Sequence, residues 1–257
     1  MRVLQPADPG VEGTALCGRV IEQSRPDHQP ADEPEWPARR RAVRDLCSRL
    51  SNDPGIAPLA ATIAADEEED RWYGAGFLAR QLGFEGELAQ VVFWLIGLKS
   101  TSGEADSKYF QASQAAACHR AGIAAPQLDT PASAIWDEHG GLLTRWIAVQ
   151  NELTAELLAG IEEVVLHRGD TIHGELPSSP THPNLWPVAS FATDYATAAS
   201  FAERAQSCRG GTPLVYSAIV PVERILATPA TGAANPLEHE VVLMTGNPDD
   251  IAMITWV

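Results

Sequence analysis

Several features that would narrow the class of protein are scarce in this chain. Only four cysteines occur among its 257 residues, and no two of them form a Cys-x-x-Cys pair. The sequence therefore predicts neither a zinc site nor a disulfide framework. No apolar run approaches the roughly 20 residues that span a membrane, and the first residues lack the apolar core of a signal peptide. We expect no membrane partner, and either a cytoplasmic location or secretion by a signal-peptide-independent route.

Basic residues are also scarce. The chain has 18 Lys and Arg against 34 Asp and Glu, a net charge of -16. Proteins that bind nucleic acid usually carry a basic face. The one basic cluster, Arg39 to Arg41 with Arg44, has the spacing of a solvated helix face. We expect no nucleic-acid partner, and the acidic surface favours a cationic one, such as an exposed arginine side chain or a small guanidine.

The first 158 residues divide into two regions. Residues 1–35 are rich in Pro, Gly, Asp and Glu without a period, which predicts an irregular arm. Apolar residues at helical spacing follow over residues 36–158, and they predict an all-helical domain. The turn expected at Gly140-Gly141 divides its last helix in two. The predicted helices are Glu35–Leu50, Ile56–Asp66, Trp72–Leu82, Glu87–Leu98, Tyr109–Ala121, Ala132–Glu138 and Leu142–Leu158.

From Gly160 the apolar pattern changes to that of strands, and residues 159–257 form the third predicted region. A helix is expected over Tyr195–Gln206, and a proline-rich loop over Gly174–Trp186. Strands with few intervening helices argue for a mixed, mainly antiparallel sheet and hence an α+β fold. The predicted strands are Val164–Arg168, Val188–Phe191, Leu214–Val220, Ile225–Leu226, Leu237–Met244 and Ile251–Val257.

Two carboxylates two residues apart, Glu238 and Glu240, precede the apolar run of one predicted strand. If the strand already begins at Glu238, both side chains project from the same face, since residues i and i+2 do so in a strand. Adjacent carboxylates repel each other, so the pair indicates a site that handles positive charge. The alternative is a solvated strand start with His239 on the opposite face.

Two upstream motifs favour a site. The strand ending in Arg168-Gly169 delivers a guanidinium beside a flexible backbone, and the next strand contains Ser190. This order of Arg, Ser and Glu-x-Glu resembles the mono-ADP-ribosyltransferase family of the Arg-Ser-Glu class, its toxin-like and ecto-enzyme branch. The resemblance covers about residues 160–257. It implies a split β-sandwich and NAD as co-substrate.

The resemblance also implies a role for each motif residue. Arg168 would grip phosphate or ribose oxygens of NAD, and the Gly169 backbone would contact the nicotinamide amide. Glu240 would hydrogen-bond the ribose and stabilise its developing positive charge, and Ser190 would orient that carboxylate. Glu238 would pair with the guanidinium that accepts ADP-ribose.

Three positions near the motifs remain open at the level of sequence. Tyr195 either stacks on the nicotinamide ring or has no contact with the ligand. His167 stands where the family commonly has another aromatic residue, often Tyr. Ala192 stands where the family often has a second hydroxyl. These two departures affect neighbours of the main positions rather than the main positions themselves.

We therefore expect an enzyme without a metal ion, a transferase that moves ADP-ribose from NAD to an arginine or other guanidino group and releases nicotinamide. Two alternatives are open. The same site would serve an NAD glycohydrolase with water as acceptor, or the domain would be a non-catalytic module that binds NAD or a partner. The complete set of Arg168, Ser190 and Glu240 argues against the last alternative.

Overall fold

The computed structural model describes residues 36–65, 75–97, 108–174, 187–231, 239–245 and 252–256. Several of the sequence predictions lie partly or wholly outside these residues. Among them are the arm over 1–35, the start of the helix Trp72–Leu82, the proline-rich loop beyond Gly174, and Glu238.

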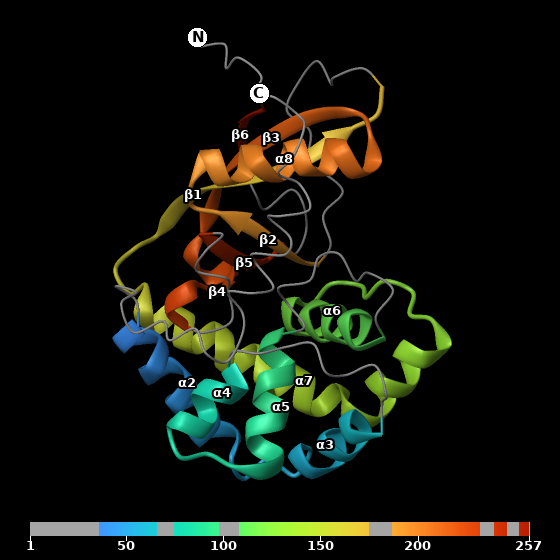
Figure 1. The fold of residues 1–257 in the computed structure, drawn as a ribbon, viewed down its shortest axis with the longest axis vertical. Coiled ribbons are helices and arrows are strands. Elements are labelled where there is room, and N and C mark those ends of the chain that lie inside the picture. The colour runs from blue at the N-terminus through green and yellow to red at the C-terminus, as the bar shows by residue number, and fades with distance from the viewer. Residues whose placement is uncertain are drawn as a thin grey trace.

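The described part of the N-terminal region is helical, as the apolar spacing predicts. Figure 1 shows these helices gathered at one end of the molecule and the strands at the other. Within the described residues, no helix is long and apolar enough to cross a bilayer. The helices are α2 (Trp36–Leu50), α3 (Ile56–Ala64), α4 (Ala75–Gln81), α5 (Gly86–Gly97), α6 (Lys108–Ala121) and α7 (Thr130–Leu157).

The turn predicted at Gly140-Gly141 is wrong, because α7 continues through both glycines over 28 residues. A Cβ atom on Gly140 would lie 2.8 Å from the Trp136 ring, so the glycine makes room for an aromatic side chain on its own helix. The apolar face of α7 is buried along its length, and Trp146 and Ile147 are fully buried. This packing outweighs the cost of about 1 kcal/mol that each glycine adds to a helix interior.

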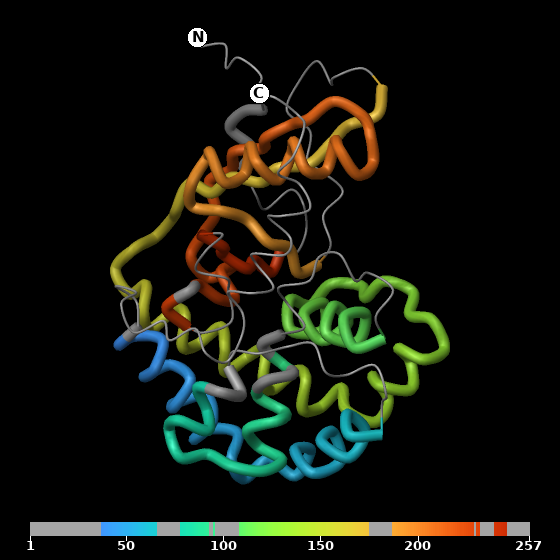
Figure 2. Tube along the Cα trace, in the orientation of Figure 1, coloured from blue at the N-terminus to red at the C-terminus, as the bar shows by residue number. Residues whose placement is uncertain are grey.

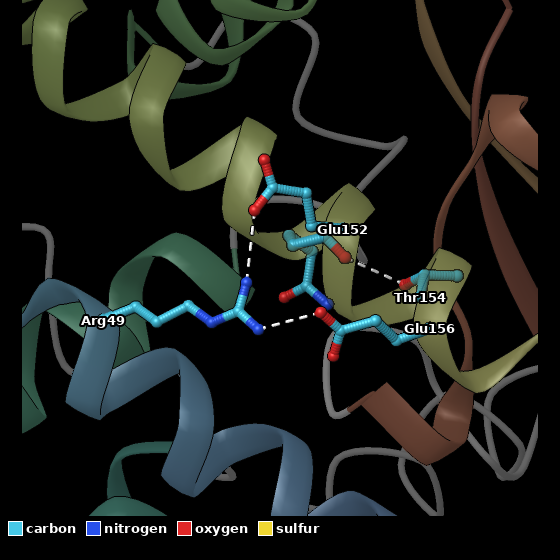
Figure 3. A network of polar contacts seen from close by, with 5 residues as sticks. Arg49, Glu152, Thr154 and Glu156 are labelled. Atoms are coloured by element: carbon cyan, nitrogen blue, oxygen red, sulfur yellow. Dashed lines mark hydrogen bonds and ion pairs between the residues drawn. The ribbon is translucent and has the colours of Figure 1, made fainter.

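The helix α7 connects the helical region to the sheet. In Figure 2 its trace runs from the neighbourhood of α3 toward that of β4. Near its C-terminal end, Glu152 and Glu156 pair with Arg49 of α2 at 3.2 and 3.0 Å, as Figure 3 shows. One turn of helix separates the two carboxylates, so a single guanidinium reaches both.

The described strands form one antiparallel sheet, and this confirms an α+β fold that is mainly antiparallel. The strand order is β4-β5-β2-β1-β3-β6. Helix α8 (Tyr195–Arg209) lies along β1 and β3 in Figure 1. The strands are β1 (Glu163–Ile172), β2 (Val188–Ala192), β3 (Thr212–Pro221), β4 (Ile225–Ala227), β5 (Glu240–Met244) and β6 (Ala252–Trp256).

The sheet consists of two halves that meet at one point. Strand β1 pairs with β3 along its whole length, and β2 pairs with β5 along its whole length. Between β1 and β2 the register contains only His167 opposite Ala192. Among the described residues, the edge of β2 that faces β1 therefore has no strand partner before Ala192.

The main hydrophobic core extends across the boundary between the helices and the sheet. It contains residues of α2 to α7 together with Val188 of β2, Leu226 of β4, and Val242 and Met244 of β5. A second cluster lies around Leu166 and Phe191 on the other face of the sheet. Strands β2, β4 and β5 thus complete their packing against the helical region.

Candidate functional site

Ser190 and Glu240 meet across neighbouring strands. The Ser190 hydroxyl donates a hydrogen bond to Oε1 of Glu240 at 2.5 Å, although 50 residues separate the two in the chain. In the register, Ala192 lies opposite Glu240, which places Ser190 diagonally across from it on the same face. Glu240 is buried, with 3% of the residue exposed. The structure therefore brings together the serine and glutamate that the sequence singles out.

Arg168 contacts the backbone of Ser190 rather than its side chain. Nη1 of Arg168 donates to the backbone carbonyl of Ser190 at 2.7 Å. His167 lies opposite Ala192, so alternation puts the next residue, Arg168, on the sheet face opposite to Glu240. Consistent with this, its guanidinium lies 6.0 Å from the centre of the Phe191 ring. Ser190 thus connects the two charged residues, because its hydroxyl bonds Glu240 and its backbone carbonyl bonds Arg168.

The guanidinium of Arg168 is mostly buried, with 17% of the side chain exposed. Burial lowers its pKa from the ordinary value, while the nearby Asp170 and Tyr216 oppose that shift. Asp170 lies 4.0 Å from Nη2 and also pairs with Arg209 of α8 at 2.6 Å. Within the described residues, Nε of Arg168 has no hydrogen-bond partner. Arg168 therefore forms part of a charged group, Arg168-Asp170-Arg209, at this end of β1.

Gly169 packs tightly against helix α8. A Cβ atom added to it would lie 1.8 Å from the carbonyl oxygen of Ala198 and 2.6 Å from the backbone nitrogen of Ala202. Any side chain at this position would collide with the helix backbone. The close approach of α8 to β1 accounts for the glycine without a ligand, and a backbone contact with nicotinamide stays a prediction.

His167 and Tyr195 lie beside each other on the Glu240 face. Their rings are 5.5 Å apart in an edge-to-face arrangement, and Nδ1 of His167 is 2.8 Å from the Ser217 hydroxyl. His167, Ala192 and Glu240 form a row across three strands in the register. Tyr195 begins α8 shortly after β2. The structure therefore places His167 next to Tyr195, the residue that is a candidate for stacking on nicotinamide.

Glu238 lies outside the described residues, and the geometry next to it differs from the expected strand. Strand β5 begins at Glu240, and His239 before it has a φ of 47°. A residue in this left-handed region interrupts the alternation of side chains. The condition under which Glu238 and Glu240 share one face, a strand that begins at Glu238, is therefore not met.

Sequence reasoning missed two neighbours of the motif residues. Asp170 lies two residues after Arg168 in the same strand, and this spacing alone predicts that their side chains project from the same face. Gln114 of α6 bonds the backbone of Val188 in β2, and no pattern in the sequence connects residues 74 positions apart. Within the described residues, no three His, Cys, Asp or Glu side chains gather as a metal site.

Comparison with known proteins finds no match for this chain among family models, curated proteins or solved structures.

Proposed function

We propose that this protein is an NAD-dependent mono-ADP-ribosyltransferase that acts on a guanidino group. The observation that carries the proposal is the connection of Arg168, Ser190 and Glu240 through two hydrogen bonds. These residues come from three strands, and the family resemblance selects the same three. A sheet that divides between β1 and β2 also supports the split β-sandwich that the resemblance implies.

The arrangement suits cleavage of the bond between nicotinamide and ribose. This bond breaks with the electron pair leaving on nicotinamide, so positive charge develops on the ribose. A buried carboxylate held by a hydroxyl is a preorganised group that stabilises such charge, because it needs no rearrangement of solvent when the charge appears. Glu240 has these properties, since it is buried and bonded to Ser190.

Arg168 supplies positive charge near the same strand, as the binding of a pyrophosphate requires. Because Arg168 and Glu240 project from opposite faces, an NAD molecule that contacts both would cross β2 where β1 diverges from it. Nε of Arg168, which has no hydrogen-bond partner among the described residues, and the adjacent Arg209 are consistent with an anionic group at this place. Asp170 competes for the same cations, so we expect NAD phosphates to loosen its contacts.

NAD glycohydrolase activity is the second candidate. Arg168, Ser190 and Glu240 would hold NAD and stabilise the ribose in hydrolysis as in transfer. Water needs less assistance than a guanidinium, which must lose a proton as its nitrogen bonds the ribose carbon. Hydrolysis would therefore use the same three residues without a need for Glu238.

One assay separates the candidates. Purified protein is incubated with labelled NAD, with and without agmatine, and nicotinamide and ADP-ribosyl-agmatine are measured together. A transferase forms both products in equal amounts when agmatine is present. A glycohydrolase releases nicotinamide without the adduct. No nicotinamide release with agmatine or with a cell lysate would contradict both.

A further inference from the structure

A glutamine of the helical region acts as a strand partner for β2. Gln114 of α6 is 1% exposed. Its Nε2 donates to the carbonyl of Val188 at 3.1 Å, and its Oε1 accepts from the N–H of the same residue at 2.6 Å. We propose that Gln114 is a positioning residue, which holds β2 in the place where Ser190 meets Glu240.

The edge of β2 that Gln114 contacts is the edge that has no strand partner before Ala192 among the described residues. Pro187 and Thr193 bond the residues just after and just before β5, since the Thr245 N–H donates to the Pro187 carbonyl and the Thr193 N–H donates to the His239 carbonyl. Backbone polar groups alternate between the two edges of a strand. Val188, Ser190 and Ala192 therefore direct their backbone polar groups toward β1, and in the described part of the chain β1 pairs with Ala192 alone of these three.

Side chains replace the missing strand along this edge. A glutamine amide offers one donor side and one acceptor, which match the N–H and carbonyl of one strand residue. Gln114 satisfies Val188, and Arg168 satisfies the Ser190 carbonyl two residues later. Buried backbone groups rarely go without partners, so this edge depends on both contacts.

The opposite side of β5 is fixed by the same helical region. Asn151 of α7 donates to the carbonyl of Ile225 at 2.9 Å, and Thr154 donates to that of Leu226 at 2.8 Å. Both acceptors lie in β4, which pairs with β5. Strand β5, with Glu240 at its start, therefore lies between two strands that α6 and α7 hold. By this inference α6 and α7 support the candidate site, and the helical region is not a separate domain that could be removed without affecting the site.

The catalytic consequence rests on the proposed function. If Gln114 is lost, Val188 has no partner on this edge, and β2 is free to shift relative to β5. A displacement of about 1 Å in a catalytic group can cost about 10²-fold in rate. We expect this loss in kcat, because the contact between Ser190 and Glu240 acts on the charge that develops during reaction, and less change in KM for NAD.

The test compares Gln114→Leu with Gln150→Leu. Gln150 is a fully buried glutamine on α7 that contacts Thr231 rather than β2. Both variants therefore carry the same substitution, of a buried glutamine by leucine, and the change in core packing is similar. Nicotinamide release is measured for kcat and KM at a temperature where both variants are folded. Hydrogen exchange of the backbone amides of residues 188–192 is measured on the same full-length proteins. Gln114→Glu, which keeps the acceptor for Val188 N–H, serves if the leucine variant does not fold.

We expect kcat to fall about 100-fold in Gln114→Leu and exchange over 188–192 to accelerate beyond that in Gln150→Leu. Equal kcat, or equal exchange, in the two variants would overturn the inference. If the wild-type protein does not turn over NAD, the proposed function fails, and the exchange comparison alone decides whether Gln114 holds β2.

Discussion

The α carbon of Gly169 lies against the backbone of α8 at Ala198, so closely that a methyl group would overlap the carbonyl oxygen. The helix cannot move away without separating its Ala198 and Ala202 from Ala192 and Val215 of the sheet, with which they form a buried cluster. The glycine after Arg168 is thus fixed by packing, whatever it contributes to a ligand.

Gly169→Ala should destabilise the fold, because overpacking against backbone costs about 1–3 kcal/mol and sometimes more. Gly141→Ala is the control. Its new methyl group would meet only the flexible tip of Arg145, in a helix interior where alanine is favoured by about 1 kcal/mol. Thermal unfolding should show a lower Tm for the first variant and an equal or higher Tm for the second. A Gly169→Ala protein as stable as the wild type would refute the packing argument.

The stability of the helical region should depend on pH through His139. Its side chain is buried in α7 with Nε2 2.9 Å from the Thr62 hydroxyl, and burial lowers its pKa below the ordinary 6.5, with Glu138 opposing the shift. The unfolded chain therefore binds the proton more readily than the folded one. Stability is unaffected above pH 6.5 and falls as the pH drops below it.

Urea unfolding at pH 7.5 and at pH 5.5 tests this expectation. The free energy of unfolding should be smaller at pH 5.5 in the wild type, and this difference should shrink in His139→Gln. The bond to Arg145 lowers the pKa of Asp53 from its ordinary value of 3.8. Asp53 therefore changes the free energy of unfolding only near and below pH 3.8, and does not contribute between pH 5.5 and 7.5. An unchanged pH difference in the variant would remove His139 from the explanation.

Arg168→Lys should weaken NAD binding. A lysine keeps the charge but lacks the planar guanidinium, which here bonds the Ser190 carbonyl while another nitrogen lies near Asp170. Calorimetry on the folded variant gives the affinity, and Arg204→Lys, at a partly buried position of α8, controls for the substitution itself. Unchanged affinity with reduced stability would assign Arg168 to holding β2 alone.

Glu238→Gln should separate transfer from hydrolysis. If Glu238 removes the proton of the incoming guanidinium, the variant loses about 10²–10⁴-fold in adduct formation, the effect of a positioned base. Slow nicotinamide release persists, because water needs little help. A single time course that follows both products decides this. Parallel loss of both would mean that Glu238 supports the ribose site or the fold.

The sequence predicts the elements of this fold better than their contacts. Apolar periodicity locates each described β-strand and α-helix, since burial imposes the period there, but it misses the 3-10 helices Val222–Arg224 and Pro229–Thr231. It fails at Gly140-Gly141, where a local preference for a turn loses to the packing of Trp136 and the rest of α7. The strand start at Glu240 is missed because the left-handed His239 follows from tertiary contacts such as the bond from Thr193 N–H.

The candidate site shows the same limit. Residue types and their order single out Arg168, Ser190 and Glu240, and the structure joins these three residues through two hydrogen bonds. Which atoms meet depends on strand register, and the sequence does not determine that Arg168 bonds a carbonyl from the face opposite Glu240. Gln114 is beyond prediction, since a buried glutamine in an alanine-rich helix carries no sign of its partner.

Nicotinamide release by Glu240→Gln tests the central claim most directly. The variant keeps the size of the side chain and an acceptor for the Ser190 hydroxyl, and removes the charge that would stabilise the ribose. Wild-type protein and the variant are followed over one time course with labelled NAD and agmatine, after their Tm values are shown to agree. The account predicts that the variant loses both nicotinamide release and adduct formation. Full NAD turnover in a folded Glu240→Gln protein would contradict it.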